Sequence, residues 1–233
     1  MVFIDMHVHS KFSDGTASVK ELLSLSKKLK TGLAITDHNT ISGSIEACKD
    51  KDALVIPGIE VGSSSFNHLL FYFYDIQELK EFYQKEILPF KIDHRFHLYR
   101  TKLPLLKLLE ISKNYNCLTS AAHPSIKTLI WTKKPLSMVD AIEVLNSSIP
   151  SKYNAKAFKI SDTLKKSKTA GSDAHSIRHL NSGGIISNES NIEGILNSVK
   201  KNKNKITGTS YTTLQNFRHT LITSNSVFRV KKV

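Results

Sequence analysis

The segment DMHVHSKFSDG, residues 5–15, places two histidines two positions apart and an aspartate five positions after the second. The residues VFIDMHVH (2–9) alternate in polarity over a short length, which is typical of a buried strand. Alternate side chains of a strand lie on one face, so His7 and His9 could contact one metal ion together, with Asp14 in the following loop. The spacing predicts a metal site at the end of the first strand, although an isolated pair of strand histidines is also common without a metal.

Residues of the same chemical kinds recur beside the later predicted strands. Strands are predicted at GLAITDH (32–38), ALVIPGIEV (53–61), HLLFYFY (68–74), CLTSAAHP (117–124), AIEVLNSS (141–148), KTAGSDAH (168–175) and GGIIS (183–187). The ligand-type residues on these segments are Asp37, His38, Glu60, His68, His123, Asp173 and His175. All of them fall near the end of a strand except His68, which opens its strand.

Helical patterns alternate with these strands. Ser18 with Glu21 predicts a capping box before the helix in VKELLSLSKKL (19–29), and Ser190 with Glu193 predicts another near the end of the pattern. Strands that alternate with helices predict a parallel α/β architecture. Because the carboxyl ends of parallel strands meet on one face, the ligand-type residues are expected to share one pocket.

Each motif taken alone also has an ordinary structural interpretation. His123 in AAHP could be a packed histidine before a rigid proline, and Asp173 in GSDAH could cap a helix. Asp37 and His38 could cap a turn, and Glu60 could be solvated. These interpretations do not explain why all the motifs occupy matching positions in successive units, and the joint pattern predicts a metal site.

The composition limits the class of protein and its partners. A chain of 233 residues with 33 Lys and Arg against 20 Asp and Glu carries a net charge of +13, which favours phosphorylated metabolites, nucleic acid or an acidic surface as partners. A solvated lysine-rich surface is the alternative explanation. No apolar run approaches the roughly 20 residues of a membrane span, and no secretory signal precedes Asp5, so we expect no membrane partner. Two cysteines are too few for a disulfide framework, and a cytoplasmic location is expected.

We expect residues 1–199 to form one domain and residues 200–233 to be a basic C-terminal extension, packed on the domain or continuous with it. The extension is polar and basic and ends in β-branched residues. It could be a tail or a pair of strands on the main sheet. The sequence leaves its role and the oligomeric state open.

The motifs DMHVHSKFSDG, ITDHNT, GIEV, AAHPS and GSDAHS, in this order, resemble the polymerase and histidinol phosphatase (PHP) domain family from about Val2 to Ile186. The resemblance implies a distorted parallel (β/α)7 barrel with a trinuclear metal centre. It implies that Zn, Mn or Fe ions are held by three groups of ligands, namely His7, His9, Glu60 and Asp173; Glu60, His68 and His123; and Asp14, His38 and His175. By the same resemblance, Asp37 would orient the histidine beside it.

Such a centre would bind a phosphate ester and lower the pKa of a bound water, which then attacks phosphorus as metal-bound hydroxide. Cationic side chains commonly assist in holding the phosphate. Candidates are Arg95, His97 and Arg100 in KIDHRFHLYRTK (91–102), and Arg178 and His179 after GSDAH. A solvated basic helix is the alternative for the first three.

The resemblance implies a hydrolase acting on phosphoric esters. The stretch GIEVGSSSFNHLLFY (58–72) resembles the stand-alone phosphoesterases of the family. The expected substrate is a phosphomonoester of a small metabolite or a nucleotide, including nucleoside bisphosphates and the ends of short oligonucleotides. The alternatives are a histidinol-phosphate phosphatase and a non-catalytic, basic nucleic-acid-binding module of the same fold.

Overall fold

The computed structural model describes residues 1–92, 100–126 and 131–211. Within these residues the strands are β1 (Val2–Val8), β2 (Gly32–Ile35), β3 (Gly58–Gly62), β4 (His68–Phe73), β5 (Cys117–Ala121), β6 (Ala141–Asn146), β7 (Ser167–Gly171), β8 (Gly183–Ser187) and β9 (Lys205–Gly208). The α-helices are α1 (Val19–Leu29), α2 (Ser42–Ala47), α3 (Ile76–Phe82), α4 (Leu105–Ile111), α5 (Lys133–Met138), α6 (Ser151–Leu164) and α7 (Ile192–Lys200). Short helical turns cover Tyr83–Ile87, Leu88–Phe90, Ser112–Asn114 and Ile177–His179.

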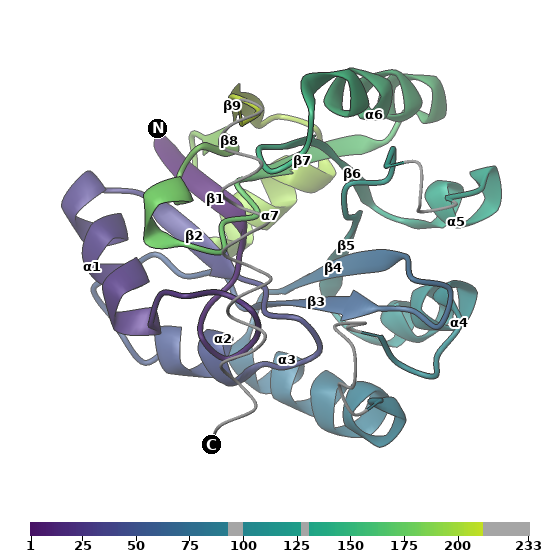
Figure 1. The fold of residues 1–233 in the computed structure, drawn as a ribbon, viewed down its shortest axis with the longest axis horizontal. Helices are drawn as coiled ribbons and strands as arrows, with labels where there is room; N and C mark the ends of the chain where they lie inside the picture. The colour runs from purple at the N-terminus through teal and green to yellow at the C-terminus, as the bar shows by residue number, and fades with distance from the viewer. Residues whose placement is uncertain (93–99, 127–130, 212–233) are drawn as a thin grey trace.

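The strands form two mixed sheets, with helices α1 to α6 around their outside (Figure 1). One sheet has the order β2-β1-β8-β9 and the other the order β3-β4-β5-β6-β7. Isolated parallel bridges join the sheets on both sides of the site: His38 pairs with Glu60, and Val8 pairs with Ala174. The α/β class is confirmed.

The expectation of a distorted parallel (β/α)7 barrel is corrected by the strand directions. β4 runs antiparallel to both β3 and β5, and β8 runs antiparallel to both β1 and β9. The cause at β4 is the connection, because a loop of residues 63–67 closes a hairpin but is too short for a parallel crossover. The remaining parallel pairs are β1 with β2, β5 with β6 and β6 with β7.

The predicted helix caps are partly confirmed. The capping box at α1 is present, with the backbone N–H of Glu21 donating to the Ser18 hydroxyl and the Ser18 backbone N–H donating to the Glu21 carboxylate. At α7 the prediction was wrong by one residue, because Asn191 caps the helix by accepting from the backbone N–H of Gly194. Asn191 places its short carbonyl three residues before that donor, as an N-cap requires.

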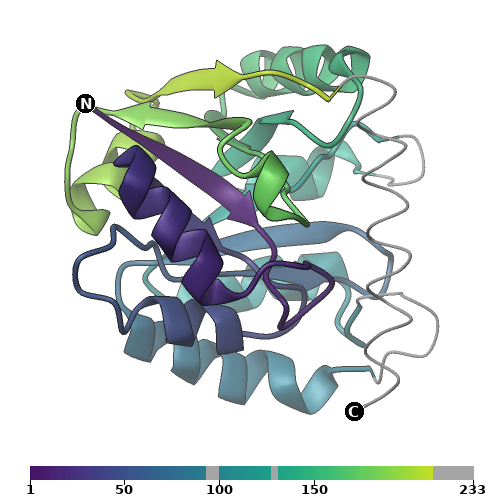
Figure 2. The same cartoon turned by 60° about the vertical axis from the view of Figure 1, so that its left-hand side comes forward.

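The apolar core has an inner part and two outer parts. The inner part takes buried side chains from both sheets, including Met6, Leu70, Tyr72, Leu118 and Ala170. The Tyr72 hydroxyl donates to the carbonyl oxygen of Met6 at 2.8 Å, so this buried polar group is satisfied across the sheets. The outer parts lie under the helices, as where α1 runs alongside the strand β1 in Figure 2.

The C-terminal part of the chain contributes a strand to the first sheet. β9 pairs antiparallel with β8 from Gly183↔Gly208 to Ile186↔Lys205. Residues 212–233 lie outside the described residues, and the proposed boundary at 199/200 stays a prediction. No helix of the described part of the chain is both long and apolar enough to cross a bilayer.

We expect Gly171→Ala to destabilise the fold where β7 meets β1. A Cβ at position 171 would lie 2.3 Å from the His7 Cβ and 2.6 Å from the His7 backbone nitrogen. Such overpacking costs about 1–3 kcal/mol, which urea unfolding would detect as a lower free energy of unfolding. The matched control is Gly194→Ala in α7, where the three atoms nearest to the added Cβ belong to the exposed Glu189 side chain and the loss of free energy of unfolding should be smaller. A Gly171→Ala protein as stable as the wild type would contradict this prediction.

Candidate metal centre

The end of β1 supplies the first part of the site. His7 and His9 are both buried on the same face of the strand, with their Nε2 atoms 3.1 Å apart. Asp5 lies on the same face, and its carboxylate accepts from the backbone N–H groups of Ser172 at 2.8 Å and Asn181 at 2.9 Å. Burial raises the pKa of Asp5 to about 6. Asp5 therefore ties β1 to the segment that follows β7.

A tight turn places Asp14 beside this strand. Gly15 is required there, because a Cβ would lie 2.4 Å from the carbonyl oxygen of His9. The Asp37 carboxylate accepts from the backbone N–H of Ser10 at 2.7 Å and from the hydroxyls of Ser10 at 2.6 Å and Ser13 at 2.7 Å. Through these bonds Asp37 holds the loop that carries Asp14, and its expected role in orienting His38 stays a prediction.

The Glu60 carboxylate on β3 lies at the centre of the cluster and is fully buried. Its Oε2 atom lies 2.7 Å from His38 Nδ1 and 3.5 Å from the Nε2 atoms of both His7 and His9. The Oε2 atom makes no contact with hydrogen-bond geometry among the described residues. Such short distances without hydrogen-bond geometry are expected when metal-ligating atoms point toward one common position between them.

Two further imidazoles approach the other oxygen of Glu60. Its Oε1 atom lies 3.1 Å from His68 Nδ1 and 3.3 Å from His123 Nε2. His68 opens β4, yet it reaches the site because the antiparallel pairing places it opposite Gly62 at the end of β3. This explains how a residue at a strand start joins residues at strand ends.

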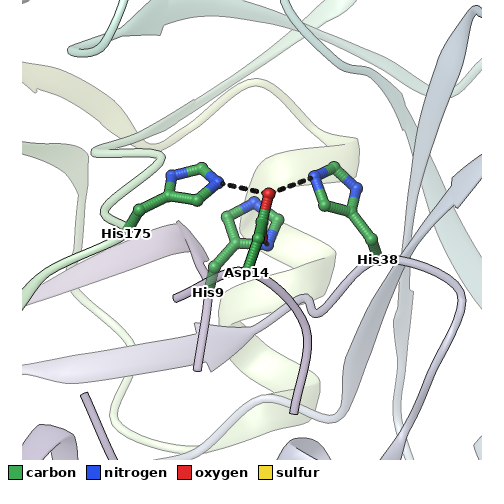
Figure 3. A group of neighbouring side chains, drawn as sticks. All are labelled: His9, Asp14, His38 and His175. Atoms are coloured by element: carbon green, nitrogen blue, oxygen red, sulfur yellow. Dashed lines mark ion pairs between the residues drawn. The ribbon is translucent and has the colours of Figure 1, made fainter. Parts of the chain in front are cut away.

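A second concentration of charge surrounds Asp14. Figure 3 shows its carboxylate between the His38 and His175 rings, with the His9 ring behind it. Asp14 Oδ2 lies 3.2 Å from His175 Nε2 and 3.6 Å from His38 Nε2, and Asp14 Oδ1 lies 3.7 Å from His9 Nδ1. One donor atom from each of these four residues lies within 4.8 Å of the others, a spacing that could hold a metal ion.

Two residues of the site have a left-handed backbone, which is unusual for non-glycine residues. His123 has φ 30° and Asp173 has φ 53°. The backbone N–H of Asp173 donates to the His7 carbonyl oxygen at 2.8 Å, and its Oδ1 atom lies 3.1 Å from His9 Nε2. Strained conformations of this kind are concentrated at functional sites, where the surrounding contacts hold them.

Glu143 on β6 is a residue of the site that the sequence analysis missed. Its Oε1 atom lies 2.8 Å from His7 Nδ1, and its Oε2 atom accepts from the backbone N–H of His123 at 2.8 Å and from Asn146 Nδ2 at 3.0 Å. With Nδ1 of His7 bound to a carboxylate, Nε2 is left facing the cluster. The available signal was an acid inside the apolar strand AIEVL (141–145), where a buried charge needs a partner.

The carboxylates of the cluster are strongly biased toward their charged form. Desolvation alone would raise their pKa values, but the neighbouring imidazoles outweigh it and lower the pKa values below the usual range in Asp14, Glu60 and Asp173. Buried carboxylates of this kind require positive charge nearby, whether from protons or from metal ions.

The histidines respond unequally to this field. Burial alone would lower the pKa of His7, but carboxylates, first that of Glu143, raise it well above its usual value. Burial likewise opposes the charge of His175, and Asp14 overcomes it to raise the pKa to about 9. His9 is surrounded by other imidazoles, and burial together with His175 lowers its pKa to about 3. His9 is thus held neutral, the form in which an imidazole ligates a metal.

The donor set fits a group of divalent ions. Mixed imidazole and carboxylate donors suit Zn, Mn and Fe. Among the described residues, the buried His123 Nδ1 makes no hydrogen bond, and three groups of donors reach within 4.8 Å of one another. All nine predicted ligands lie in this one cluster: His7, His9, Asp14, His38, Glu60, His68, His123, Asp173 and His175.

The predicted phosphate-binding residues are less directly connected to the cluster. Arg178 and His179 lie on the turn after His175, where Arg178 is exposed and His179 packs against the Tyr211 ring at 4.4 Å. The Arg100 guanidinium lies over the Phe66 ring. Arg95 and His97 lie outside the described residues.

Solved structures share this fold at low sequence identity. PsfC from Pseudomonas syringae PB-5123 is 16% identical with a TM-score of 0.68, covering 100% of this chain and 99% of that one. A candidate metal-dependent phosphoesterase from Bifidobacterium adolescentis is 17% identical with a TM-score of 0.60, covering 91% and 98%. The lesion-specific endonuclease PfuEndoQ from Pyrococcus furiosus is 20% identical with a TM-score of 0.68, covering 88% of this chain and 57% of that one.

No curated protein is a significant match to this sequence. Two family models match it: the PHP domain over residues 5–127, slightly more than half of the chain, and the PHP-associated domain over residues 151–204. The first match contains the clustered residues from His7 to His123. The chain belongs to the PHP domain family.

Proposed function

We propose that this protein is a metal-dependent phosphoesterase that hydrolyses a phosphomonoester of a small metabolite or a nucleotide. The observation that supports the proposal is the convergence of six imidazoles on buried carboxylates centred on Glu60. The candidate phosphoesterase from Bifidobacterium adolescentis has the same fold. No serine or cysteine nucleophile is needed for the proposed hydrolysis.

The proposed ligand groups are those that the resemblance to the family implies. His7, His9, Glu60 and Asp173 would hold one ion; Glu60, His68 and His123 a second; and Asp14, His38 and His175 a third. When bound, divalent ions supply Lewis acidity and a lowered pKa for water near neutral pH. Glu60 belongs to two of the groups because both of its oxygens are surrounded by imidazole nitrogens.

The charge of the site favours a phosphate group as its occupant. Three divalent ions bring more positive charge than the carboxylates of Asp14, Glu60 and Asp173 neutralise, since the imidazoles in their ligating form add none. A phosphate dianion balances this surplus. Hydrolysis adds the oxygen of water to phosphorus and breaks the ester P–O bond, and the leaving alcohol takes up a proton. Among the described side chains, we propose Arg178 as an additional phosphate contact.

Two alternatives concern the partner. Histidinol phosphate is also a phosphomonoester, and the same cluster could act on it. The fold shared with a lesion-specific endonuclease and the net charge of +13 favour nucleic acid as a second candidate. The complete set of ligand-type residues argues against a non-catalytic binding module, because such a module would not need them.

The central test is metal-dependent turnover. Protein supplied with Mn²⁺ should release phosphate from a panel of phosphorylated metabolites, including histidinol phosphate, and of nucleotides, and EDTA should stop the release. His9→Ala and Asp173→Ala should each lower kcat/KM by at least about 100-fold, because they remove donors from the centre of the cluster. Asp162→Ala is the matched control, since this side chain is exposed and its ion pair among the described residues is with Lys168. Full activity in the His9→Ala and Asp173→Ala variants would reject the site.

Glu143→Gln tests the residue that holds His7. The amide keeps the shape of the side chain but removes the charge that fixes the His7 ring, and such losses typically cost 10–100-fold in metal affinity or activity. Titration of the metal-free protein with Zn²⁺, followed by calorimetry, should show this weakening with little change in secondary structure by circular dichroism. Unchanged affinity would show that Glu143 has only a packing role.

Salt dependence separates a small substrate from nucleic acid. A small phosphate ester contacts few cationic side chains, so we expect KM to change by less than about 10-fold between 50 and 200 mM salt. A partner with many phosphate contacts would lose about 10³-fold or more in affinity over the same range. Steady-state kinetics on the best metabolite and binding of a labelled oligonucleotide supply the two measurements.

A further inference from the structure

The loop between β3 and β4 has an aromatic residue where its geometry favours glycine. Gly62 pairs with His68 across the hairpin, and the Ser63 backbone N–H donates to the Asn67 carbonyl oxygen at 2.8 Å. Phe66 lies within this closed loop with φ 66°. Glycine or asparagine normally occupies such a left-handed position in a hairpin, because a bulky side chain strains it.

The Phe66 side chain is also exposed, with 41% of its surface accessible. With this much of the ring in water, Phe66 gains only part of the free energy that full burial would give, and the left-handed backbone adds a cost of its own. The hairpin is closed by backbone hydrogen bonds that do not involve this ring. The hydrogen bonds of the hairpin therefore do not require a phenylalanine at position 66.

Arg100 lies against this ring at the edge of the site. Its guanidinium carbon is 4.8 Å from the centre of the Phe66 ring, within the range of a cation–π contact. The next residue, Thr101, is fully buried, and its backbone N–H donates to the Gly62 carbonyl oxygen at 2.7 Å. Arg100 is thus anchored to the end of β3 by its own backbone neighbour.

The ring and the guanidinium lie close to the proposed metal centre. Phe66 is two residues before His68, and a chain of two residues spans at most about 7 Å. His68 Nδ1 is itself 3.1 Å from Glu60 Oε1. Phe66 and Arg100 therefore lie within reach of a group attached to a phosphate that is bound at the cluster.

We propose that Phe66 and Arg100 form a platform for the nucleobase of the substrate, which would be a nucleoside phosphate. This inference rests on the proposed function and names the substrate class of the same site. Bases stack on aromatic side chains and on arginine, and each stacked base typically contributes enough that removing the ring weakens binding by about 5-fold or more. Phe66 is then a specificity-determining residue, and the accessible part of its ring gains a contact when the ligand binds.

The test compares two substrates that differ in the base. Wild type, Phe66→Gly, Phe66→Tyr and Arg100→Gln are assayed with Mn²⁺ on a nucleoside 5′-monophosphate and on ribose 5-phosphate. Phe66→Gly should raise KM for the nucleotide by about 5-fold or more and leave ribose 5-phosphate unchanged, while Phe66→Tyr should retain the wild-type KM. Arg100→Gln should raise KM for the nucleotide more than it raises KM for ribose 5-phosphate. Leu29→Ala is the matched control, because Leu29 is another exposed apolar side chain, at the end of α1. It should leave KM for both substrates unchanged.

Thermal unfolding distinguishes this role from a structural one. Because glycine relieves the strain at φ 66°, the Tm of Phe66→Gly should equal or exceed that of the wild type. A lower Tm together with equal losses on both substrates would overturn the inference and indicate that the ring supports the hairpin.

Direct binding separates the inference from the proposed function. Calorimetric titration should show that the nucleotide binds more tightly than ribose 5-phosphate to the wild type and that Phe66→Gly removes the difference. Base-dependent binding without turnover would reject the phosphoesterase and retain the platform. Turnover with no preference for the base, or absence of nucleotide binding, would overturn the platform, and in the former case the phosphoesterase would stand.

Discussion

The arrangement of the site depends on the buried charge of Glu60. A carboxylate with no exposed surface is costly unless positive charge lies next to it. Here the nitrogen atoms of five imidazoles lie within 3.5 Å of its two oxygens. These imidazoles come from both sheets. The ends of several strands must therefore meet for the charge of Glu60 to be compensated. The same requirement makes the cluster a strong candidate to bind divalent ions, which would satisfy the carboxylate more fully than protons do.

The positions of the ligand-type residues could be predicted from the sequence because their side chains depend on local pattern. His7 and His9 share a face for the same reason that alternate residues do in any strand. Strand direction could not be obtained from periodicity, since parallel and antiparallel strands have the same alternation. The short loop 63–67 contained that information, and it explains how His68 reaches the site from a strand start.

Other features required contacts between distant segments. Glu143 is 136 positions from the His7 ring that it holds, and no spacing rule connects the two. The same is true of Asp37, whose bonds to Ser10 and Ser13 cross from β2 to the loop after β1. Sequence pattern identifies residues that are unsuited to a core, but it does not identify their partners, because the partner depends on how the strands are arranged.

The structure separates the parts that hold the ions from the parts that would select a substrate. The donors lie on strands and on tight turns where close approach leaves little room for change, as at Gly15 and Gly171. The loop between β3 and β4 has no comparable restriction at Phe66, whose ring is exposed and could be replaced without disturbing the backbone bonds of the hairpin. Since a fold does not by itself fix a substrate, specificity is expected to reside in loops of this kind. An aromatic residue at this left-handed position fits the proposed base platform, because the accessible part of its ring can contact a ligand and the hydrogen bonds of the hairpin do not depend on it.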